Sequence, residues 1–240
     1  MHILAGTSGY AYKEWKGPFY PEKLPQDQML RFYGERFPTV EINNTFYRMP
    51  SEKVLLNWAA QVPEPFAFVL KASQRITHHK RLQDVGEELG YFLKTASVLG
   101  PRLGPTLFQL PPNFKKDLPR LNAFLDLLPH RWRAALEFRH ASWRDDAVYD
   151  ALRGHGVAWC VADTDDDAAP VVATADWGYL RLRREGYAAE DLTRWAETVL
   201  GQPWQDAFVF FKHEDAGAGP ALAQAFLAAV SARSSDSPPP

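Results

Sequence analysis

Two glutamates in separate apolar segments could carry out acid–base chemistry. Glu41 and Glu137 could divide the roles of general acid and general base if a cation keeps one ionised while burial raises the pKa of the other. The alternative is that each glutamate only pairs with a neighbouring cation, because structural ion-pair networks also perturb pKa values. We predict catalytic roles for both glutamates and keep ion pairing as the alternative.

Basic residues at comparable positions could hold an anion. Lys71, Arg139 and Arg181 are expected to clamp a phosphate group by charge-assisted hydrogen bonds. With Asp163 and the two glutamates they form a balanced set of charges that could also pair mutually and merely close the fold. Lys71 could instead form a Schiff base with a carbonyl substrate.

A divalent metal is a less favoured alternative, and no cofactor is assigned. Oxygen and nitrogen ligands could come from Glu41, Glu137, His140, Asp163 and His213. None of these residues has the spacing of a local motif such as H-E-x-x-H, and Lys71 and Arg139 would repel a cation.

Aromatic and further basic residues follow the same segments. The basic residues include Arg48, Arg75 and the segment 78–81, which we interpret as a solvated basic patch. The aromatic residues are Tyr10, Tyr12, Trp15, Phe46, Tyr47 and Trp143. Cations among aromatics suit a ligand with anionic groups and a flat face, such as a nucleotide or single-stranded nucleic acid, and a sugar would also fit. The alternative for the aromatics is loop packing.

The charged residues alternate with apolar ones, as in a strand with two different faces. Val40 and Ile42 would lie on one face, and Glu41 and Asn43 on the other. The same alternation sets Phe68 and Leu70 against Lys71 and Ser73, Leu136 and Phe138 against Glu137 and Arg139, and Leu180 and Leu182 against Arg181 and Arg183. In a closed barrel the apolar face packs against helices, so the charged face points inward or upward.

Eight such strands alternate with amphipathic helical segments. They are expected to begin near Ile3, Thr39, Ala67, Thr106, Ala134, Val157, Gly178 and Ala207. This pattern predicts an α/β fold, a single (β/α)8 barrel, whose polar residues, including Gln109 and Asp163, gather where the strands end. The crossover between the sixth and seventh strands should be irregular, because residues 165–167 and Pro170 interrupt any helix. Ser142 is expected to cap a helix.

Length and composition agree with one barrel domain. The chain has 240 residues, close to the roughly 250 that such a barrel needs. We expect the domain to span residues 1–230 and the Ser- and Pro-rich residues 231–240 to form a disordered tail.

Charge and cysteine content exclude few classes of function. The net charge of −2 gives no general attraction to nucleic acid or anionic membranes, so an anion site must be local. The single cysteine, Cys160, is expected to be a buried strand residue. Without a signal-peptide pattern or a long apolar run, the sequence predicts a cytoplasmic protein with no membrane partner. It does not predict the oligomeric state.

Several motifs resemble one family. They are residues 6–10 (GTSGY), 41–48 (EINNTFYR), 71–73 (KAS), 108–112 (FQLPP) and 137–140 (EFRH). Together they are similar to the YecE-like barrels, long grouped as a domain of unknown function, although residues 211–215 depart from the usual pattern. The resemblance implies a TIM-type barrel and a site formed by Tyr10, Glu41, Asn43, Thr45, Tyr47, Lys71, Gln109, Glu137, Arg139, His140, Asp163 and Arg181.

These observations favour an enzyme that acts on a polar, phosphate-bearing small molecule or nucleic acid. Hydrolytic or acid–base chemistry, on a phosphoester or glycosidic bond, would rest on Glu41 and Glu137, and the remaining site residues would bind substrate. The rival is a non-catalytic barrel that binds a metabolite or nucleic acid with the same charges, since the fold hosts many functions.

Overall fold

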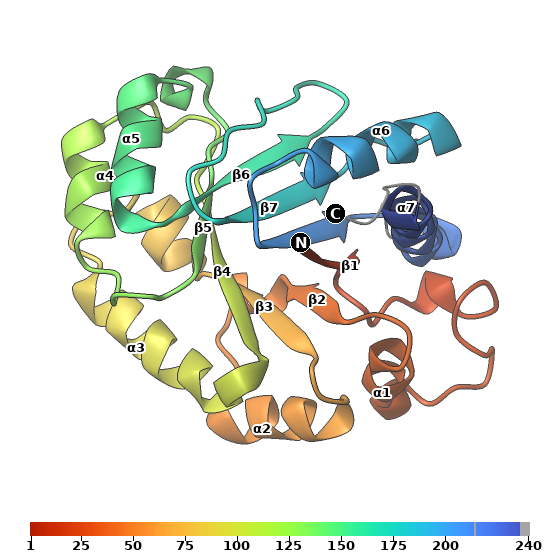
Figure 1. Ribbon diagram of the computed structural model, residues 1–240. Coiled ribbons are helices and arrows are strands. Elements are labelled where there is room, and N and C mark those ends of the chain that lie inside the picture. The colour runs from red at the N-terminus through yellow and green to blue at the C-terminus, as the bar shows by residue number, and fades with distance from the viewer. Residues whose placement is uncertain (214, 236–240) are drawn as a thin grey trace.

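Eight parallel strands form a closed barrel in which each strand pairs with its neighbours in chain order and β8 returns to β1 (Figure 1). The computed structural model describes residues 1–213 and 215–235. The strands are β1 (His2–Ser8), β2 (Thr39–Ile42), β3 (Ala67–Lys71), β4 (Leu103–Gln109), β5 (Ala134–Glu137), β6 (Ala158–Asp163), β7 (Trp177–Leu182) and β8 (Asp206–Phe211). The predicted (β/α)8 barrel is confirmed, and the largest change at a strand start is in β4, which begins at Leu103 rather than Thr106.

Helices surround the barrel and connect most successive strands. The α-helices are α1 (Met29–Gly34), α2 (Glu52–Gln61), α3 (Gly86–Ala96), α4 (Leu118–Leu125), α5 (Asp146–His155), α6 (Ala189–Leu200) and α7 (Ala218–Ser235). Shorter helical segments are η1 (Lys13–Trp15), η2 (Gln26–Gln28), η3 (Asn44–Phe46), η4 (Arg75–His79), η5 (Ser97–Arg102), η6 (Ala141–Trp143) and η7 (Asp215–Gly217). Residues 164–176, which are all described, contain no helix, so the irregular crossover between β6 and β7 is as predicted.

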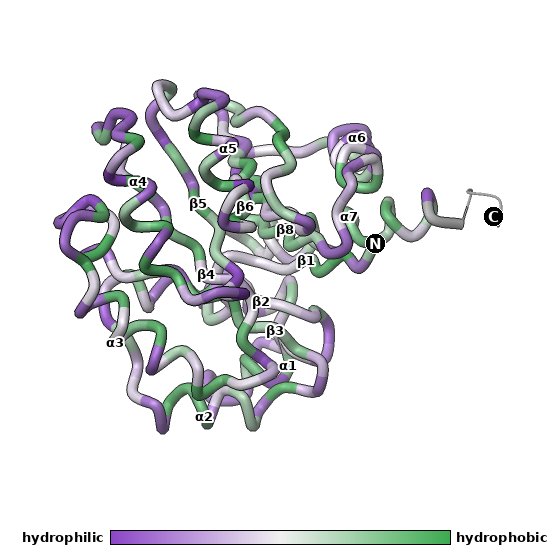
Figure 2. The backbone as a smooth tube through the Cα atoms, turned by 60° about the vertical axis from the view of Figure 1, so that its left-hand side comes forward, coloured by the Kyte–Doolittle hydropathy of each residue, from purple (hydrophilic) through white to green (hydrophobic). Residues whose placement is uncertain are grey.

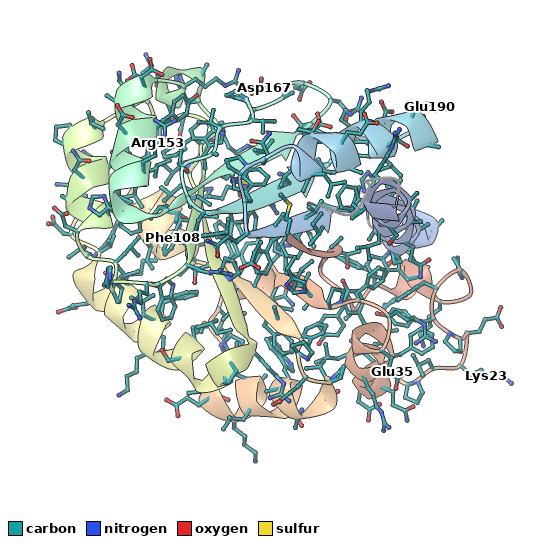
Figure 3. The ribbon with its side chains drawn as sticks, viewed as in Figure 1. Lys23, Glu35, Phe108, Arg153, Asp167 and Glu190 are labelled. Atoms are coloured by element: carbon teal, nitrogen blue, oxygen red, sulfur yellow. The ribbon has the colours of Figure 1, made fainter. Side chains whose placement is uncertain are left out.

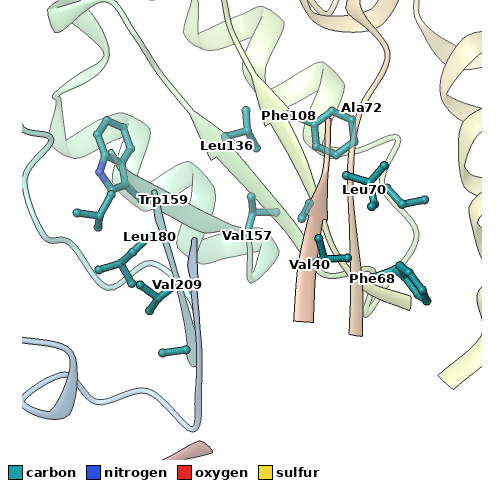
Figure 4. Packing of buried hydrophobic residues seen from close by; sticks show 14 of the residues in the cluster. Val40, Phe68, Leu70, Ala72, Phe108, Leu136, Val157, Trp159, Leu180 and Val209 are labelled. Carbon is teal, nitrogen blue, oxygen red and sulfur yellow. The ribbon is translucent and has the colours of Figure 1, made fainter. Parts of the chain in front are cut away.

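The apolar core has two parts because strand side chains alternate between the barrel interior and the helices. Val40, Leu70, Phe108, Leu136 and Leu180 pack on the helix-facing side (Figure 4). A second cluster fills the interior with Leu4, Val69, Leu107, Ala135, Ala158, Cys160, Trp177, Tyr179, Phe208 and Phe210. The interior cluster ends where the charged residues begin, so the polar site lies above a packed apolar floor.

Hydropathy follows this arrangement. Apolar and polar stretches alternate along the backbone of the helices in Figure 2, as expected where one face of each helix packs on the barrel. In Figure 3, Lys23, Glu35 and Glu190 lie at the periphery, whereas Phe108 lies near the centre. Among the residues that the structure describes, none of the helices is long and apolar enough to cross a bilayer.

The expected cap at Ser142 is wrong. Helix α5 begins at Asp146, and Asp145 caps it by accepting a hydrogen bond from the Ala147 amide at 3.0 Å. Ser142 instead lies in η6, where its hydroxyl accepts a hydrogen bond from the Lys116 amide at 2.8 Å. Two candidate caps close together in sequence compete, and the carboxylate adjacent to the helix satisfies its first free amides.

The boundary at residue 230 also needs correction. Residues 231–235 continue α7, where the Ser231 hydroxyl donates to the Leu227 carbonyl at 3.0 Å and Arg233 pairs with Glu197 of α6 at 2.6 Å. The contact between α6 and α7 extends the helix beyond the point where composition alone predicts its end. The remainder of the predicted tail, residues 236–240, lies outside the described residues.

Candidate functional site

A buried guanidinium joins two carboxylates at the C-terminal end of the barrel. Arg181 of β7 donates from Nη1 to Glu137 Oε2 at 2.6 Å and from Nη2 to Glu41 Oε1 at 2.7 Å. The side chains of all three residues are at most 2% exposed. Parallel strands end on the same face of the barrel, so residues distant in sequence converge there. The predicted convergence of Glu41, Glu137 and Arg181 is therefore present.

Neutral side chains complete the hydrogen bonds of these carboxylates. Ser8 donates to Glu41 Oε1 at 2.7 Å, and Tyr179 donates to Glu41 Oε2 at 2.6 Å. Gln109 donates to Glu137 Oε1 at 2.8 Å. Sequence reasoning missed Ser8 and Tyr179 because they carry no charge, although Tyr179 lies two residues before Arg181 and so shares its face.

Both glutamates are held ionised. Burial opposes ionisation, but the Arg181 charge and the hydrogen bonds from Arg181, Ser8 and Tyr179 keep the pKa of Glu41 below its ordinary value. Burial is likewise outweighed at Glu137, where the charges of Arg181 and Arg183 lower the pKa to about 2. Neither carboxyl group has the raised pKa that a general acid at neutral pH requires.

Lys71 extends the network toward the mouth of the barrel. Its ammonium group donates to Gln109 Oε1 at 2.7 Å and lies 4.1 Å from the ring centre of Phe46. Burial, followed by the Arg181 charge, lowers the pKa of Lys71 to about 8. Tyr179, Glu41, Arg181, Glu137, Gln109 and Lys71 thus form one continuous chain of polar contacts.

Two further arginines lie above Glu137. Arg139 Nε is 4.0 Å from Glu137 Oε1, and Arg183 Nη1 is 3.8 Å from the same oxygen. Their side chains are 42% and 20% exposed, compared with 2% for Glu137. Arg183 was not among the predicted site residues, although its place on the same face as Arg181 was evident from the alternation. In this cluster positive charges outnumber negative ones, and the positive charges are the more exposed.

Asp163 does not join the cluster. It accepts hydrogen bonds from Arg184 Nε at 3.0 Å and from the Tyr187 hydroxyl at 2.9 Å. Cys160 points into the barrel, so Asp163, three residues later, belongs to the helix-facing side of β6. Together with α6 residues it lines a separate cavity of about 320 Å³. Of the six charged residues predicted to form the site, Asp163 is separate. The other five converge at the end of the barrel, namely Glu41, Lys71, Glu137, Arg139 and Arg181.

Three other predicted residues have local contacts. The Thr45 hydroxyl bonds the carbonyls of Ile42 at 3.0 Å and Lys71 at 2.7 Å, which joins the ends of β2 and β3. Tyr47 is 72% exposed. His140 Nδ1 lies 3.1 Å from the Ser142 amide and accepts its hydrogen bond at the start of η6. Thr45 and His140 therefore shape the loops around the mouth.

Tyr10 and Asn43 line a small cavity beside the network. Its volume is about 220 Å³, and it is bounded by Gly9, Tyr10, Ala11, Tyr12, Ile42, Asn43, Asn44 and Trp58. Asn43 Nδ2 is buried without a hydrogen-bond partner among residues 1–213 and 215–235. The structure thus places these two predicted residues together, next to the charged cluster rather than inside it.

The basic segment after β3 is partly neutralised. It begins with η4, a π-helical turn, and both Arg75 and Lys80 pair with Glu88 of α3, at 2.8 and 2.9 Å. Arg81 has a left-handed backbone with φ of 50°. His78 packs against Phe46 with their ring centres 4.9 Å apart. The segment is less available to a polyanion than the sequence indicates.

The described part of the chain holds no cluster of three His, Cys, Asp or Glu side chains of the kind that binds a metal. Of the expected ligands, His213 contacts the Arg184 carbonyl through Nε2. A cavity of about 570 Å³ lies among the loops before β5, β6 and β7, with Trp132 and Trp177 in its wall. It is at the N-terminal end of the strands, where barrel enzymes do not place their catalytic residues.

Comparisons with known proteins agree with this description. A family model described as "Protein of unknown function DUF72" matches residues 4–240. The UPF0759 protein YunF of Bacillus subtilis is 33% identical over 228 residues, covering 88% of this chain and 78% of YunF. The UPF0759 protein YecE of Escherichia coli O157:H7 is 37% identical over 141 residues, covering 56% of this chain and 52% of YecE. The match thus spans about half the length of that relative, and the resemblance to YecE-like proteins is confirmed.

Solved structures share the fold. A DUF72 family protein from Thermotoga maritima superimposes with a TM-score of 0.81 at 27% identity, covering 96% of this chain and 100% of that chain. A DUF72 family protein from Enterococcus faecalis gives a TM-score of 0.80 at 18% identity, covering 95% of both chains. The second similarity supports the fold alone.

Proposed function

We propose a function for this chain, which belongs to the DUF72 family. The mouth of its barrel binds a phosphate-bearing ligand, and Lys71 transfers protons there. The observation that supports the proposal is that two carboxylates lie deepest in the site and that Lys71, Arg183 and Arg139 lie nearer to solvent. Glu41 and Glu137 are almost fully buried. The exposed fraction rises from 9% at Lys71 to 20% at the Arg183 side chain and 42% at the Arg139 side chain. A ligand approaching from solvent meets the cations first.

The anion preference follows from this order. Arg181 is already engaged by two carboxylates at 2.6 and 2.7 Å. Arg139 and Arg183 contact Glu137 only at 4.0 and 3.8 Å, so their guanidinium groups retain donors for another acceptor. Guanidinium groups match phosphate geometry with two parallel hydrogen bonds. The buried carboxylates would keep the cations in place without meeting the ligand.

Lys71 suits proton transfer better than either glutamate. A group whose pKa lies near the working pH exchanges protons most effectively, and the pKa of Lys71 is about 8. Glu41 has both oxygens occupied by Arg181, Ser8 and Tyr179 and is 0% exposed, which favours a positioning role. We therefore transfer the acid–base role expected of the glutamates to Lys71.

The reaction class that fits this arrangement is phosphoester hydrolysis. The neutral form of Lys71, a minor fraction at pH 7, would accept a proton from the attacking water and return it to the leaving oxygen, while Arg139 and Arg183 stay charged and neutralise the phosphoryl group. A cytoplasmic location is part of the proposal. The non-catalytic binding barrel makes the same prediction for affinity and differs only in turnover.

Calorimetry with inorganic phosphate and a panel of phosphomonoesters and phosphodiesters tests the proposal. Lys71→Met keeps the aliphatic stem but removes the charge, and should weaken phosphate binding about tenfold or more and abolish turnover. Lys94→Met on the exposed face of α3 is the matched control and should change neither. Unchanged affinity in Lys71→Met would refute the anion site, whereas lost affinity without turnover in the parent protein would favour the binding barrel.

A further inference from the structure

The cavity beside the network has the features of a ring-binding pocket. Tyr10, Tyr12 and Trp58 contribute aromatic side chains to its wall. Its volume of about 220 Å³ lies below the range of roughly 300–1,000 Å³ typical of sites that enclose a whole ligand. It therefore fits one flat ring system, and the rest of the ligand would lie outside it.

One polar group at this cavity is buried without a partner, and a second has a hydroxyl that no described residue bonds. Asn43 Nδ2 is buried without an acceptor, although a buried amide donor left unpaired costs free energy. Tyr10 lines the same cavity, and its hydroxyl makes no hydrogen bond to the described residues, although its backbone carbonyl accepts one from Tyr20 at 2.6 Å. A ring that carries its own acceptors would satisfy the Asn43 amide and would offer the Tyr10 hydroxyl a partner.

The cavity is connected to the charged cluster through β1 and β2. The Ser8 carbonyl accepts a hydrogen bond from the Tyr12 hydroxyl at 2.8 Å, and the Ser8 hydroxyl donates to Glu41 at 2.7 Å. The Gly9 amide donates to the Glu41 carbonyl at 2.7 Å. A side chain at Gly9, which has φ of +88°, would come within 2.4 Å of the Tyr12 hydroxyl, so only glycine permits this wall.

We propose that this cavity binds the base of a mononucleotide whose phosphate is held by Lys71, Arg139 and Arg183. The proposal rests on the function proposed above and adds the substrate class. Aromatic walls stack on a heteroaromatic ring, and the unpaired Asn43 amide donates to a ring nitrogen or carbonyl. A sugar phosphate or inorganic phosphate would occupy only the mouth.

The test compares ligands that differ in base and phosphate. Affinities of the full chain are measured for the four common ribonucleoside 5′-monophosphates, ribose 5-phosphate and the matching nucleosides. At least one nucleotide should bind about tenfold or more tightly than ribose 5-phosphate, as expected for a stacked base. Asn43→Leu should reduce that ratio severalfold, because the aromatic walls remain but the amide donor is lost, without changing the affinity for ribose 5-phosphate.

Two further variants keep the result interpretable. Tyr10→Phe removes only a hydroxyl and should lower nucleotide affinity alone, even if Asn43→Leu fails to fold. Asn122→Leu on the exposed face of α4 makes the same chemical change away from the site and should have no effect. Equal affinity of the parent protein for nucleotides and ribose 5-phosphate overturns the base pocket but not the phosphate site. Nucleoside binding without any affinity for ribose 5-phosphate supports the pocket and overturns the phosphate site.

Discussion

Lys71 is the residue whose chemistry depends most on its surroundings. Its ammonium lies between the Phe46 ring at 4.1 Å and Gln109 Oε1 at 2.7 Å, and the nearby Arg181 charge disfavours protonation further. A lysine in water stays mostly charged up to about pH 10. Here the charge is retained at neutral pH by a narrow margin, so Lys71 should lose its proton well before the arginines at the mouth.

Sulfate binding should therefore weaken as the pH rises through about 8. Below that pH Lys71 is an ammonium group and attracts the anion, and above it the neutral amine does not. Sulfate keeps its charge over this range, so the change belongs to the protein. Affinity measured from pH 6.5 to 10 should fall by up to about tenfold per pH unit above the pKa.

Lys71→Arg supplies the control for this prediction. Arginine stays protonated throughout the range, so sulfate affinity in the variant should be nearly independent of pH. The same decline in both proteins would assign the titration to another group and would contradict the role of Lys71.

At the scale of elements, the first two strands are joined by one buried tyrosine. The Tyr33 hydroxyl of α1 accepts from the Thr7 amide of β1 at 2.8 Å and donates to the Thr39 carbonyl of β2 at 3.0 Å. Tyr33 is 0% exposed. This contact fixes the strands from which Ser8 and Glu41 enter the network.

Tyr33→Phe should lower the free energy of unfolding by about 1–3 kcal/mol, because it leaves a buried amide and a buried carbonyl unpaired. Urea denaturation measures the loss. Tyr91→Phe on α3 removes the same hydroxyl from a residue that is 61% exposed and should change little. If both variants unfold at the same urea concentration as the parent protein, Tyr33 does not join the strands as described.

The sequence predicted the structure correctly where the alternation of side chains along a strand decides which residues face the barrel interior. Val40 and Glu41 separate cleanly onto helix-facing and interior sides, so strand positions and the inward charges follow directly. It failed for Asp163, because the inward face of β6 carries only small or apolar residues such as Cys160 and gives no polar signal to set the register. It could not place Asn43 at a cavity wall, because that depends on the loop after β2 and on Trp58 of α2.

For the whole molecule, the polar network is the layer that closes the C-terminal end of the barrel. Its side chains come from β1, β2, β3, β4, β5 and β7, so most strands are linked there by hydrogen bonds as well as by the backbone. The interior below it is apolar. The layer depends on two ionised carboxylates, and it should therefore fail in acid before the apolar interior does.

Global stability should consequently fall between pH 4.5 and 2. Glu137 has a folded-state pKa of about 2, below its ordinary value of 4.5, so the folded protein binds fewer protons than the unfolded chain in this window. The stabilisation is complete above pH 4.5 and is lost as the pH falls toward 2, with a total of about 3 kcal/mol for this one group.

Glu137→Gln should be less stable at neutral pH, and its free energy of unfolding should depend less steeply on pH in this window. Urea titrations at several pH values measure the slope, with Glu87→Gln on the exposed face of α3 as the control. Identical slopes in Glu137→Gln and the parent protein would mean that this carboxylate is not held ionised by the arginines around it.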